Sequence, residues 1–387
     1  MGRPIQIGLY SPYFGTTWGG GEKYLARTAR CLADALPNDG IEIASPVPVQ
    51  RADLEASLGV SLDGIRTLST NHRVTPIHTF LNGVGPLRPL RNLVVGNQAE
   101  RLSARYDLFV GMSYAVSVAS KAPESLMLCQ FPHREGQTAA SGYRTIVCAS
   151  EYVRGWIERW WGRNALVVPP PIHIPTDAPP LDGKANMILS VGRFFQGGHT
   201  KRQDMLVTAF RRLCEDGLKG WELHLAGGTH DQGPHRGYYD SVVALGAGYP
   251  VVLHPNCPPN ILQELYGSAA IYWHGAGYGS DPETHPEAME HFGMTTVEAM
   301  AQGAVPVVFD AGGQTEIVTD GVDGQLFSTI EQLRDLTVDL IEEPARRRAL
   351  ATSARARSLN FGEGLFCDRI LSAMDPAIEA ARTHQRS

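Results

Sequence analysis

The sequence of 387 residues contains no run of about 18 to 20 apolar residues, the length that a membrane-spanning helix needs. Its first residues, MGRPIQIGLYSPYFG, lack the charged and then apolar layout of a signal peptide, so we expect a protein that is not secreted. Six cysteines are scattered, at positions 31, 129, 148, 214, 257 and 367, and none forms a C-x-x-C pair. This pattern argues against a disulfide scaffold or a zinc site and predicts reduced thiols in a cytoplasmic protein.

The chain carries a net negative charge, which would repel the phosphates of a nucleic acid. Its net charge is −6, which argues against a nucleic-acid binder. An apolar content of 43% and a charged content of 19% are typical of a globular protein, and the length predicts two domains. Basic residues outnumber acidic ones over residues 1–180, and the reverse holds over the remainder, so the first half is the one suited to an anionic surface.

Short apolar, β-branched segments alternate with helical patterns along the chain, which predicts parallel α/β layers. In the first half, IQIGLY, YDLFVGM, SLMLCQF and TIVCAS are predicted strands, and GEKYLARTARCLADAL and SEYVRGWIERWWG are predicted helices. The proline-rich stretch VVPPPIHIPTDAPPLDGKA cannot be crossed by a helix and is predicted to be a linker. We therefore place an N-terminal domain at residues 1–178 and a C-terminal domain at residues 179–387.

The second half of the sequence shows the same alternation of predicted strands and helices. MILSVGRF, WELHLAGG, PVVLHPN, AIYWHGA and AVPVVFD are predicted strands, with KRQDMLVTAFRRLCEDG, PPNILQELYGSAA and TTVEAMAQG as helices between them. The predicted fold class is α/β, with two Rossmann-like, doubly wound domains facing a cleft. Open parallel sheets bind ligands at the carboxyl ends of their strands, so we expect the functional residues there.

In each domain, a glycine-rich loop follows the first predicted strand. In WGGGEKYLARTA, Gly20 and Gly21 would let a ligand approach the backbone where a helix begins, although a tight strand-to-helix turn explains them equally well. In SVGRFFQGGHTKRQ, Arg193 and Lys201 flank a glycine-containing loop and suit a diphosphate. The alternative for these two cations is an ordinary solvated surface.

The segment EHFGMTTVEAMAQGAVPVV places Glu290 and Glu298 around a Phe-Gly turn and the predicted start of a helix near Thr295. Helix N-terminal amides favour an anion, whereas carboxylates accept hydrogen bonds from sugar hydroxyls. A nucleoside-diphosphate sugar combines both demands, because it is anionic in the middle and hydroxylated at both ends. The simpler explanation for the two glutamates is helix capping.

These segments together resemble those of a known family. EHFGMTTVEAMAQGAVPVVFDAGGQTEIV looks like the donor-site signature of the large retaining glycosyltransferase family with the GT-B fold, family four, with its E-x7-E motif at Glu290 and Glu298. The GGGEKY loop, VGRFFQGGHTKRQ, HLAGG and GGQTEIVTDGVDGQLF follow in the family's order, so the resemblance covers nearly the whole chain. It implies the GT-B architecture, with the last helix as a candidate to cross back to the N-terminal domain.

The resemblance implies a role for each matching residue. Glu298 is similar to the glutamate that holds the ribose, and Glu290 to the one that faces the donor sugar. Arg193 and Lys201 match the diphosphate-binding pair. The remaining implied donor-binding residues are the loop glycines and the backbone amides of the turn: Gly20, Gly21, Phe292, Gly293 and Met294.

One position departs from the family pattern. LMLCQFPHREG resembles the segment in which many members carry a histidine directly before FP or YP, near the acceptor and the transferred sugar. Here Gln130 occupies that position and His133 follows three residues later. On a strand this shift turns a side chain to the other face unless Pro132 ends the strand first. His133 is therefore a candidate catalytic residue, with a buried or capping histidine as the alternative.

The resemblance implies retaining transfer of a hexose by same-face displacement, in which the protein positions the substrates and stabilises charge on the leaving diphosphate. The sequence has no D-x-D motif, so we expect no essential metal and no cofactor beyond the nucleotide-sugar co-substrate. A non-catalytic nucleotide-sugar-binding protein and a GT-B phosphorylase or epimerase remain alternatives. A dinucleotide oxidoreductase would need G-x-G-x-x-G in the first glycine loop, which is absent.

The donor and acceptor are less constrained. EHFG and CQFP resemble segments of mannosyltransferases that act in lipid-linked oligosaccharide assembly, which favours GDP-mannose over UDP-sugars and a saccharide or lipid-linked saccharide as acceptor. Residues 83–105 carry Arg88, Arg91, Arg101 and Arg105 among leucines at helical intervals. This stretch predicts either a solvated helix packed on the first sheet or a peripheral contact with the inner membrane face.

Overall fold

The computed structural model describes residues 3–15, 19–70, 99–114, 118–197, 199–229 and 233–385, and it divides the chain into two compact units. Unit 1 comprises Met1–Pro171 together with Glu363–Ser387, and unit 2 is the continuous segment Ile172–Gly362. The first crossing between units thus lies seven residues before the predicted boundary, at the start of the proline-rich stretch. The second crossing assigns the last helix to unit 1.

Unit 1 is built on a parallel sheet with the strand order β3-β2-β1-β4-β5-β6-β7. Its strands are β1 (Gln6–Tyr10), β2 (Gly40–Ser45), β3 (Arg66–Ser69), β4 (Leu108–Tyr114), β5 (Glu124–Phe131), β6 (Thr145–Cys148) and β7 (Leu166–Val167). Its main helices are α1 (Gly20–Ala35), α2 (Arg51–Leu58), α5 (Gln137–Ser141), α6 (Glu151–Trp161) and α14 (Glu363–His384). The order reverses between β1 and β4, as in a Rossmann fold.

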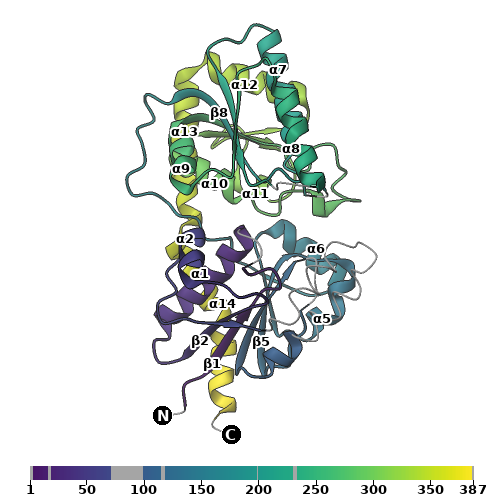
Figure 1. Cartoon of the computed structure of the whole chain (residues 1–387), viewed down its shortest axis with the longest axis vertical. Helices are drawn as coiled ribbons and strands as arrows, with labels where there is room; N and C mark the ends of the chain where they lie inside the picture. Colours follow the sequence, from purple (N-terminus) through teal and green to yellow (C-terminus); the bar gives the residue numbers. More distant parts are fainter. Residues whose placement is uncertain are drawn as a thin grey trace. The chain divides into compact units, whose positions relative to one another are not determined.

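Helix α14, yellow in Figure 1, packs beside the purple α1 and against β4 and β5. Phe366, Ile370 and Met374 of α14 are fully buried in the same core cluster as the β1 strand residues. Cys31 of α1 and Cys367 of α14 form a disulfide. The expectation that all six cysteines are reduced thiols is wrong, because it used sequence spacing, whereas α14 brings two distant cysteines onto facing helices.

Unit 2 repeats the arrangement with the strand order β10-β9-β8-β11-β12-β13, all parallel. Its strands are β8 (Ala185–Val191), β9 (Glu222–Gly227), β10 (Val251–Pro255), β11 (Ala269–His274), β12 (Val305–Phe309) and β13 (Gln325–Phe327). Its longer helices are α7 (Gln203–Glu215), α8 (Gly233–Gly246), α9 (Pro259–Ser268), α10 (Met294–Gln302), α12 (Ile330–Glu342) and α13 (Pro344–Ser358). The predicted class of two doubly wound α/β domains is confirmed.

The helices of unit 2 cover its sheet in two layers. Helix α7 contacts α8 and α12 in one layer, and α10 contacts α9 and α13 in the other (Figure 1). Fully buried aliphatic residues such as Ile188, Leu223 and Ile271 fill the interior next to α7. The strands are buried on both faces, which explains why they appear in the sequence as continuous apolar segments.

Candidate functional site

The predicted donor-site residues of unit 2 gather where β8 and β11 end, at the point where the strand order reverses. Gly192 and Arg193 follow β8, and His274 is the last residue of β11. The N–H of Gly192 donates to the carbonyl of Ala226 at 2.9 Å, which ties this loop to the end of β9. A Cβ on Gly227 would lie 2.0 Å from the carbonyl oxygen of Gly192, so the close approach of the two loops requires glycine there.

Lys201 and Glu290 form the central contact of this site. The Nζ of Lys201 donates to Oε2 of Glu290 at 2.5 Å and to Nε2 of His199 at 2.9 Å. The glutamate side chain is 11% exposed and the lysine side chain 18%. An ammonium has three N–H donors, so within the described part of the chain one donor of Lys201 is left for a ligand.

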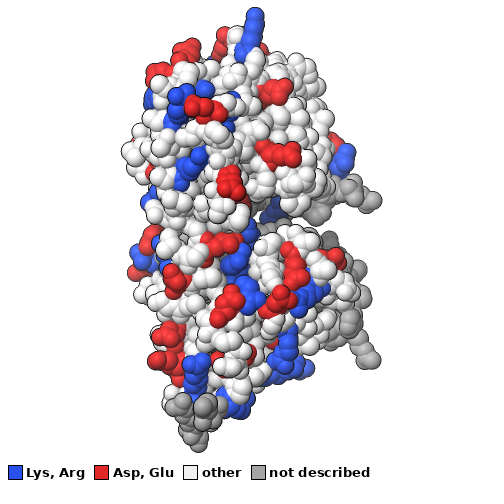
Figure 2. Space-filling model, turned by 90° about the vertical axis from the view of Figure 1, so that its left-hand side faces the viewer, with Lys and Arg blue, Asp and Glu red and all other residues white. Residues whose placement is uncertain are grey.

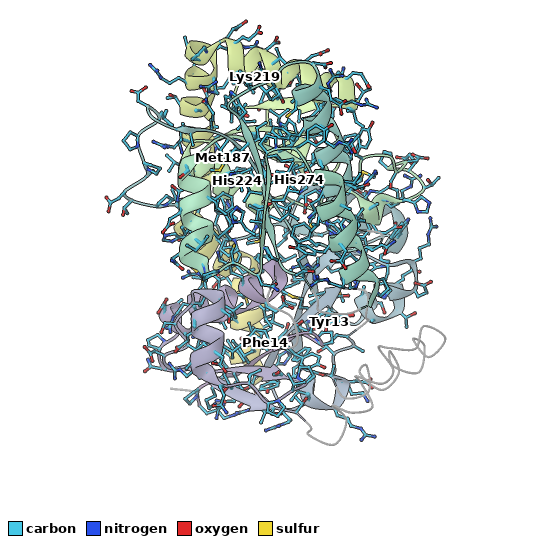
Figure 3. The ribbon with its side chains drawn as sticks, turned by 45° about the horizontal axis from the view of Figure 1, so that its top comes forward. Tyr13, Phe14, Met187, Lys219, His224 and His274 are labelled. Carbon is cyan, nitrogen blue, oxygen red and sulfur yellow. A yellow bond between two sulfur atoms is a disulfide. The ribbon has the colours of Figure 1, made fainter. Side chains whose placement is uncertain are left out.

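His274 holds the same carboxylate from the sheet. Its Nε2 lies 2.9 Å from Oε2 of Glu290, and the backbone N–H of Ala276 donates to its Nδ1 at 3.4 Å. A neutral imidazole that accepts at Nδ1 carries its proton on Nε2, the nitrogen that lies beside the glutamate. The side chain of His274 is 1% exposed (Figure 3), which leaves it no alternative contact with solvent.

The charges of this cluster favour an ionised glutamate among neutral imidazoles. Burial alone would raise the pKa of Glu290, but the nearby Lys201, together with His199 and His274, outweighs burial and holds the pKa well below its usual range. Burial lowers the pKa of His274 and of His199, where Lys201 adds to the effect. Burial, with His199 as the next cause, also places the pKa of His291 well below its usual range. At neutral pH the cluster therefore has one anion and one cation.

Arg193 supplies a second cation close to Lys201. Its side chain is exposed and lies over the ring of Phe195, with 5.6 Å between the guanidinium carbon and the ring centroid. Phe195 stacks in turn on His235 at 4.2 Å between centroids. No ion pair of Arg193 with an acid is found among the residues that the structure describes, so its guanidinium is available to an anionic ligand.

Helix α10 begins beside this cluster. Gly293 precedes its first residue with φ of +119°, and a Cβ there would also meet the amide of Gln314 at 2.9 Å, so the turn requires glycine. Phe292 is buried against Phe361, and Met294 is the first helical residue. The free amides of such a helix N-terminus are groups that favour an anion.

Glu298 lies one residue further into α10 than the predicted start near Thr295 implies. The helix begins at Met294, so Glu298 falls in its second turn, and the first turn holds no acidic residue. Its Oε2 accepts a hydrogen bond of 2.8 Å from the hydroxyl of Tyr266 in α9. This hydrogen bond ties Glu298 to α9, a contact that helix capping does not require.

The predicted residues of unit 1 gather at the corresponding edge of its own sheet. Gly20 and Gly21 open α1 after β1, and the N–H of Gly19 donates to the carboxylate of Glu22 at 3.0 Å. A Cβ on Gly21 would lie 3.8 Å from the amide of Gln130 on β5 and 3.5 Å from Met112 on β4. The glycine loop and the residue that replaces the family's histidine are therefore neighbours.

His133 lies away from this pair. It follows the end of β5, its carbonyl accepts the indole N–H of Trp161 at 2.9 Å, and its ring meets that of Trp161 edge-on. Burial lowers the pKa of its imidazole. The strand ends at Phe131, directly before Pro132, and the chain then enters a short 3-10 turn and α5, where His133 packs against Trp161 of α6. The structure favours the packing role over the catalytic one.

Sequence reasoning missed the three histidines that surround Glu290. His199, His274 and His291 come from three separate segments, and the rings of His199 and His291 meet at 4.5 Å. The signal was present: His274 ends a buried strand, where an aliphatic residue is expected, and His291 directly follows the first glutamate of the motif. Neither position matched a family role, so neither was singled out.

Over the described ranges, no group of three or more His, Cys, Asp or Glu side chains is arranged to hold a metal ion. No described helix combines the length and the apolar character needed to cross a membrane. Of the basic stretch 83–105, residues 83–98 lie outside the described part, and Arg101 and Arg105 are exposed.

Residues 176–357, which cover most of unit 2, match the family model described as glycosyl transferases group 1. A curated relative, D-inositol 3-phosphate glycosyltransferase 1 of Catenulispora acidiphila, is 33% identical over 140 residues. This match covers 36% of the chain and 31% of the relative, so it spans less than a third of that protein.

Two solved structures show the fold of the whole chain. The Anabaena protein HepE in complex with UDP and glucose gives a TM-score of 0.68 at 15% identity, and covers 96% of this chain and 99% of that one. The sucrose-phosphate synthase of Thermosynechococcus elongatus gives 0.70 at 16% identity, with 97% and 100% covered. The chain thus has the two Rossmann-like domains of the GT-B architecture, as predicted.

Proposed function

We propose that this chain is a retaining glycosyltransferase that moves a hexose from a nucleoside-diphosphate sugar to a saccharide or lipid-linked saccharide. The observation that carries the proposal is the contact of Lys201 with Glu290, at the point where the strand order of unit 2 reverses. Arg193 lies beside this contact. Two cations, one ionised carboxylate and a helix N-terminus suit a ligand with phosphates next to hydroxyls. The family match over residues 176–357 supports the same assignment.

In the proposed reaction the nucleoside diphosphate departs as the acceptor hydroxyl attacks the same face of the sugar. Arg193 and the remaining N–H of Lys201 would bind the diphosphate and stabilise the charge that grows on it. Glu290, fixed by His274 and Lys201, would accept hydrogen bonds from hydroxyls of the transferred sugar. Glu298 would hold the ribose. The leaving phosphate itself would take the acceptor proton, which would remove the need for a histidine at the position of Gln130.

The donor base and sugar are the open part of the proposal. The segments EHFG and CQFP favour GDP-mannose, whereas the structural neighbour HepE is described in complex with UDP and glucose. We retain GDP-mannose as the first donor to test, with UDP-glucose as its comparison. We also propose that the two cations replace a divalent metal, that no cofactor is needed, and that the protein acts in the cytoplasm.

The test is calorimetric titration of GDP, UDP and their sugars into wild-type protein, Lys201→Ala and Lys219→Ala. Lys219 is an exposed lysine of unit 2 far from His274 (Figure 3), so it is a matched control. Losing a charged hydrogen bond costs about 1.5 to 3 kcal/mol, so Lys201→Ala should bind the donor roughly ten- to a hundredfold more weakly. Equal affinity in all three proteins would refute the site assignment.

A transfer assay separates the remaining alternatives. Binding without turnover of any donor and acceptor sugar would favour a non-catalytic nucleotide-sugar-binding protein. Transfer to inorganic phosphate, or interconversion of nucleotide sugars, would instead identify a phosphorylase or an epimerase. Retention of the anomeric configuration in the product, read by NMR, is the outcome that the proposal requires.

A further inference from the structure

A polar cavity lies in unit 2, at the opposite end of its sheet from Glu290. Lys184, which lines it, directly precedes β8, whereas Arg193 follows that strand. Gly303 at the end of α10 and Pro344 at the start of α13 form other parts of the wall. The cavity has a volume of about 90 Å³. None of the residues assigned to the donor site contributes to it.

Positive charge dominates the lining of this cavity. Lys184, Arg347 and Arg348 line it, and Asp182 is the one acidic residue among the lining residues. Asp182 lies 2.9 Å from Arg348, but the side chains are 74% and 59% exposed, so water screens this pair. On the face drawn in Figure 2, basic and acidic side chains are interspersed.

The cations are held in place and still have donors to spare. The Nζ of Lys184 donates to the carbonyls of Gly267 and Gln302, both at 2.6 Å, which leaves its third N–H without an acceptor in the described residues. Arg347 donates from Nη1 to the carbonyl of Leu340 at 2.6 Å and lies over the ring of Trp221, and no other acceptor for its guanidinium is found among the described residues. The N-terminus of α13, a helix of 15 residues, adds the positive end of its dipole through Pro344.

Grouping these cations has an electrostatic cost. Burial, followed by the nearby Arg355, lowers the pKa of Lys184 to about 8. Burial and then Arg348 lower the pKa of Arg347. A charged form that is disfavoured by burial and by like charges becomes favoured when an anion enters. An anion in the cavity would therefore be bound by groups that are already positioned.

We propose that this cavity binds a small divalent oxyanion with the size and charge of phosphate or sulfate, at a site separate from the donor site. The cavity is too small for a nucleoside diphosphate, and three cationic side chains line it. Lys184 and Arg347 are the anchoring residues, and Arg348 is the exposed residue that closes the site. The proposal does not depend on the proposed transferase activity.

The first experiment measures sulfate binding to the full-length protein by calorimetry, with sodium chloride at equal ionic strength as the reference. Arg348→Ala removes a lining cation that is exposed, so the variant should fold, and we expect about tenfold weaker sulfate binding. Arg346→Ala is the matched control, because Arg346 stands on the same helix, faces Asp339 and Glu343, and is not a lining residue. Wild-type protein that binds no sulfate, or equal weakening in both variants, would overturn the proposal.

The second experiment tests Lys184 without replacing it. Sulfate does not titrate near neutral pH, so any proton that is taken from the buffer on binding must be bound by the protein. With a pKa of about 8, Lys184 is partly neutral at pH 8 and charged at pH 6.5, and a bound dianion would raise its pKa. We expect proton uptake at pH 8 and none at pH 6.5, read from binding enthalpies in two buffers. Sulfate binding at pH 8 without proton uptake would overturn the assignment of Lys184 to the site.

Discussion

The Nε2 atom of His274 lies 2.9 Å from the carboxylate of Glu290, so the last residue of a central strand fixes the first glutamate of the loop that faces it. Glu290 also receives Lys201, and its own carbonyl accepts the N–H of Gly313 at 2.7 Å. Both the side chain and the backbone of the glutamate are therefore held before any ligand arrives. Such preorganisation is what stabilisation of a charged transition state requires.

The first prediction concerns His274 as a positioning residue. His274→Leu removes the N–H that holds Glu290 and should lower kcat about ten- to a hundredfold, because a buried hydrogen bond to a charge is lost. His274→Gln retains an N–H donor and should recover part of the activity. If both variants keep wild-type kcat, the histidine does not act through Glu290. Circular dichroism checks that each variant is folded.

The second prediction concerns Glu298 and its partner Tyr266. Glu298→Ala should weaken nucleotide binding roughly tenfold or more, since the carboxylate is proposed to hold the ribose. Tyr266→Phe removes only the 2.8 Å hydrogen bond to Glu298 and should have a smaller effect. Calorimetry with the nucleoside diphosphate provides the measurement. An unchanged affinity in Glu298→Ala would leave this residue with a structural role alone.

The third prediction concerns acid stability. The pKa values of His199, His274 and His291 are lowered in the folded protein, so the unfolded chain binds more protons there once the pH falls below about 6.5. The pKa of Glu290 is also lowered, so its contribution is lost only at more acidic pH, as the pH falls below about 4.5 and through the folded value. Both effects have the same sign, and the free energy of unfolding should fall on acidification, the histidine part first.

Chemical denaturation at a series of pH values checks this sign. His274→Gln retains a donor but does not titrate, so the slope of stability between pH 6.5 and 5 should decrease. His173→Gln is the control, because His173 is exposed. A slope that is the same in wild type and His274→Gln would show that His274 does not contribute to the pH dependence.

The fourth prediction concerns metals. If Arg193 and Lys201 neutralise the diphosphate, transfer should continue in excess EDTA. Activity that is lost on chelation and restored by Mn²⁺ would show that a metal performs this task. Inactive Arg193→Ala that is rescued by Mn²⁺ would instead agree with the cation's proposed role.

The fifth prediction tests the peripheral membrane contact proposed for residues 83–105. Each cation near an anionic surface contributes about 1 kcal/mol, so four arginines would give weak, salt-sensitive attachment. Wild-type protein should pellet with anionic liposomes at low salt and not at high salt, and Arg88→Glu/Arg91→Glu should pellet less. Equal behaviour of the two proteins would favour a soluble acceptor and the packed-helix interpretation.

Much of the fold and part of the candidate site followed from the sequence. Apolar segments that alternate with helical periods specify parallel layers, and parallel strands place their carboxyl ends at one edge. Lys201 was predicted at the start of the helix after one such strand and Glu290 before a turn that leads into another helix, and the fold brings the two together. His274 was missed because a histidine that ends an apolar strand carries no periodic signal, and only the neighbouring loop shows that its partner is Glu290.

The disulfide was missed for a different reason. Periodicity describes each helix alone and does not say which helices face one another, so the contact of α1 with α14 could not be obtained from it. Cys31 and Cys367 are paired by that contact. The boundary of the domains is limited in the same way, because proline marks where a helix cannot continue and not where the packing of a unit ends.

The separation of unit 1 into two stretches of chain has a consequence for the order in which the protein folds during synthesis. Residues 3–171 leave the ribosome first, but the core around Ile7 and Leu9 also contains Phe366 and Ile370 of α14. Unit 2 is complete once Gly362 has emerged, when the first unit still lacks a helix that packs on its sheet. The ends of unit 2 also meet, since the N–H of Ile172 donates to the carbonyl of Phe361 at 3.0 Å. The second unit along the chain is therefore the first that can fold to completion, and the N-terminal half waits, with apolar surface exposed, for the last helix to be made.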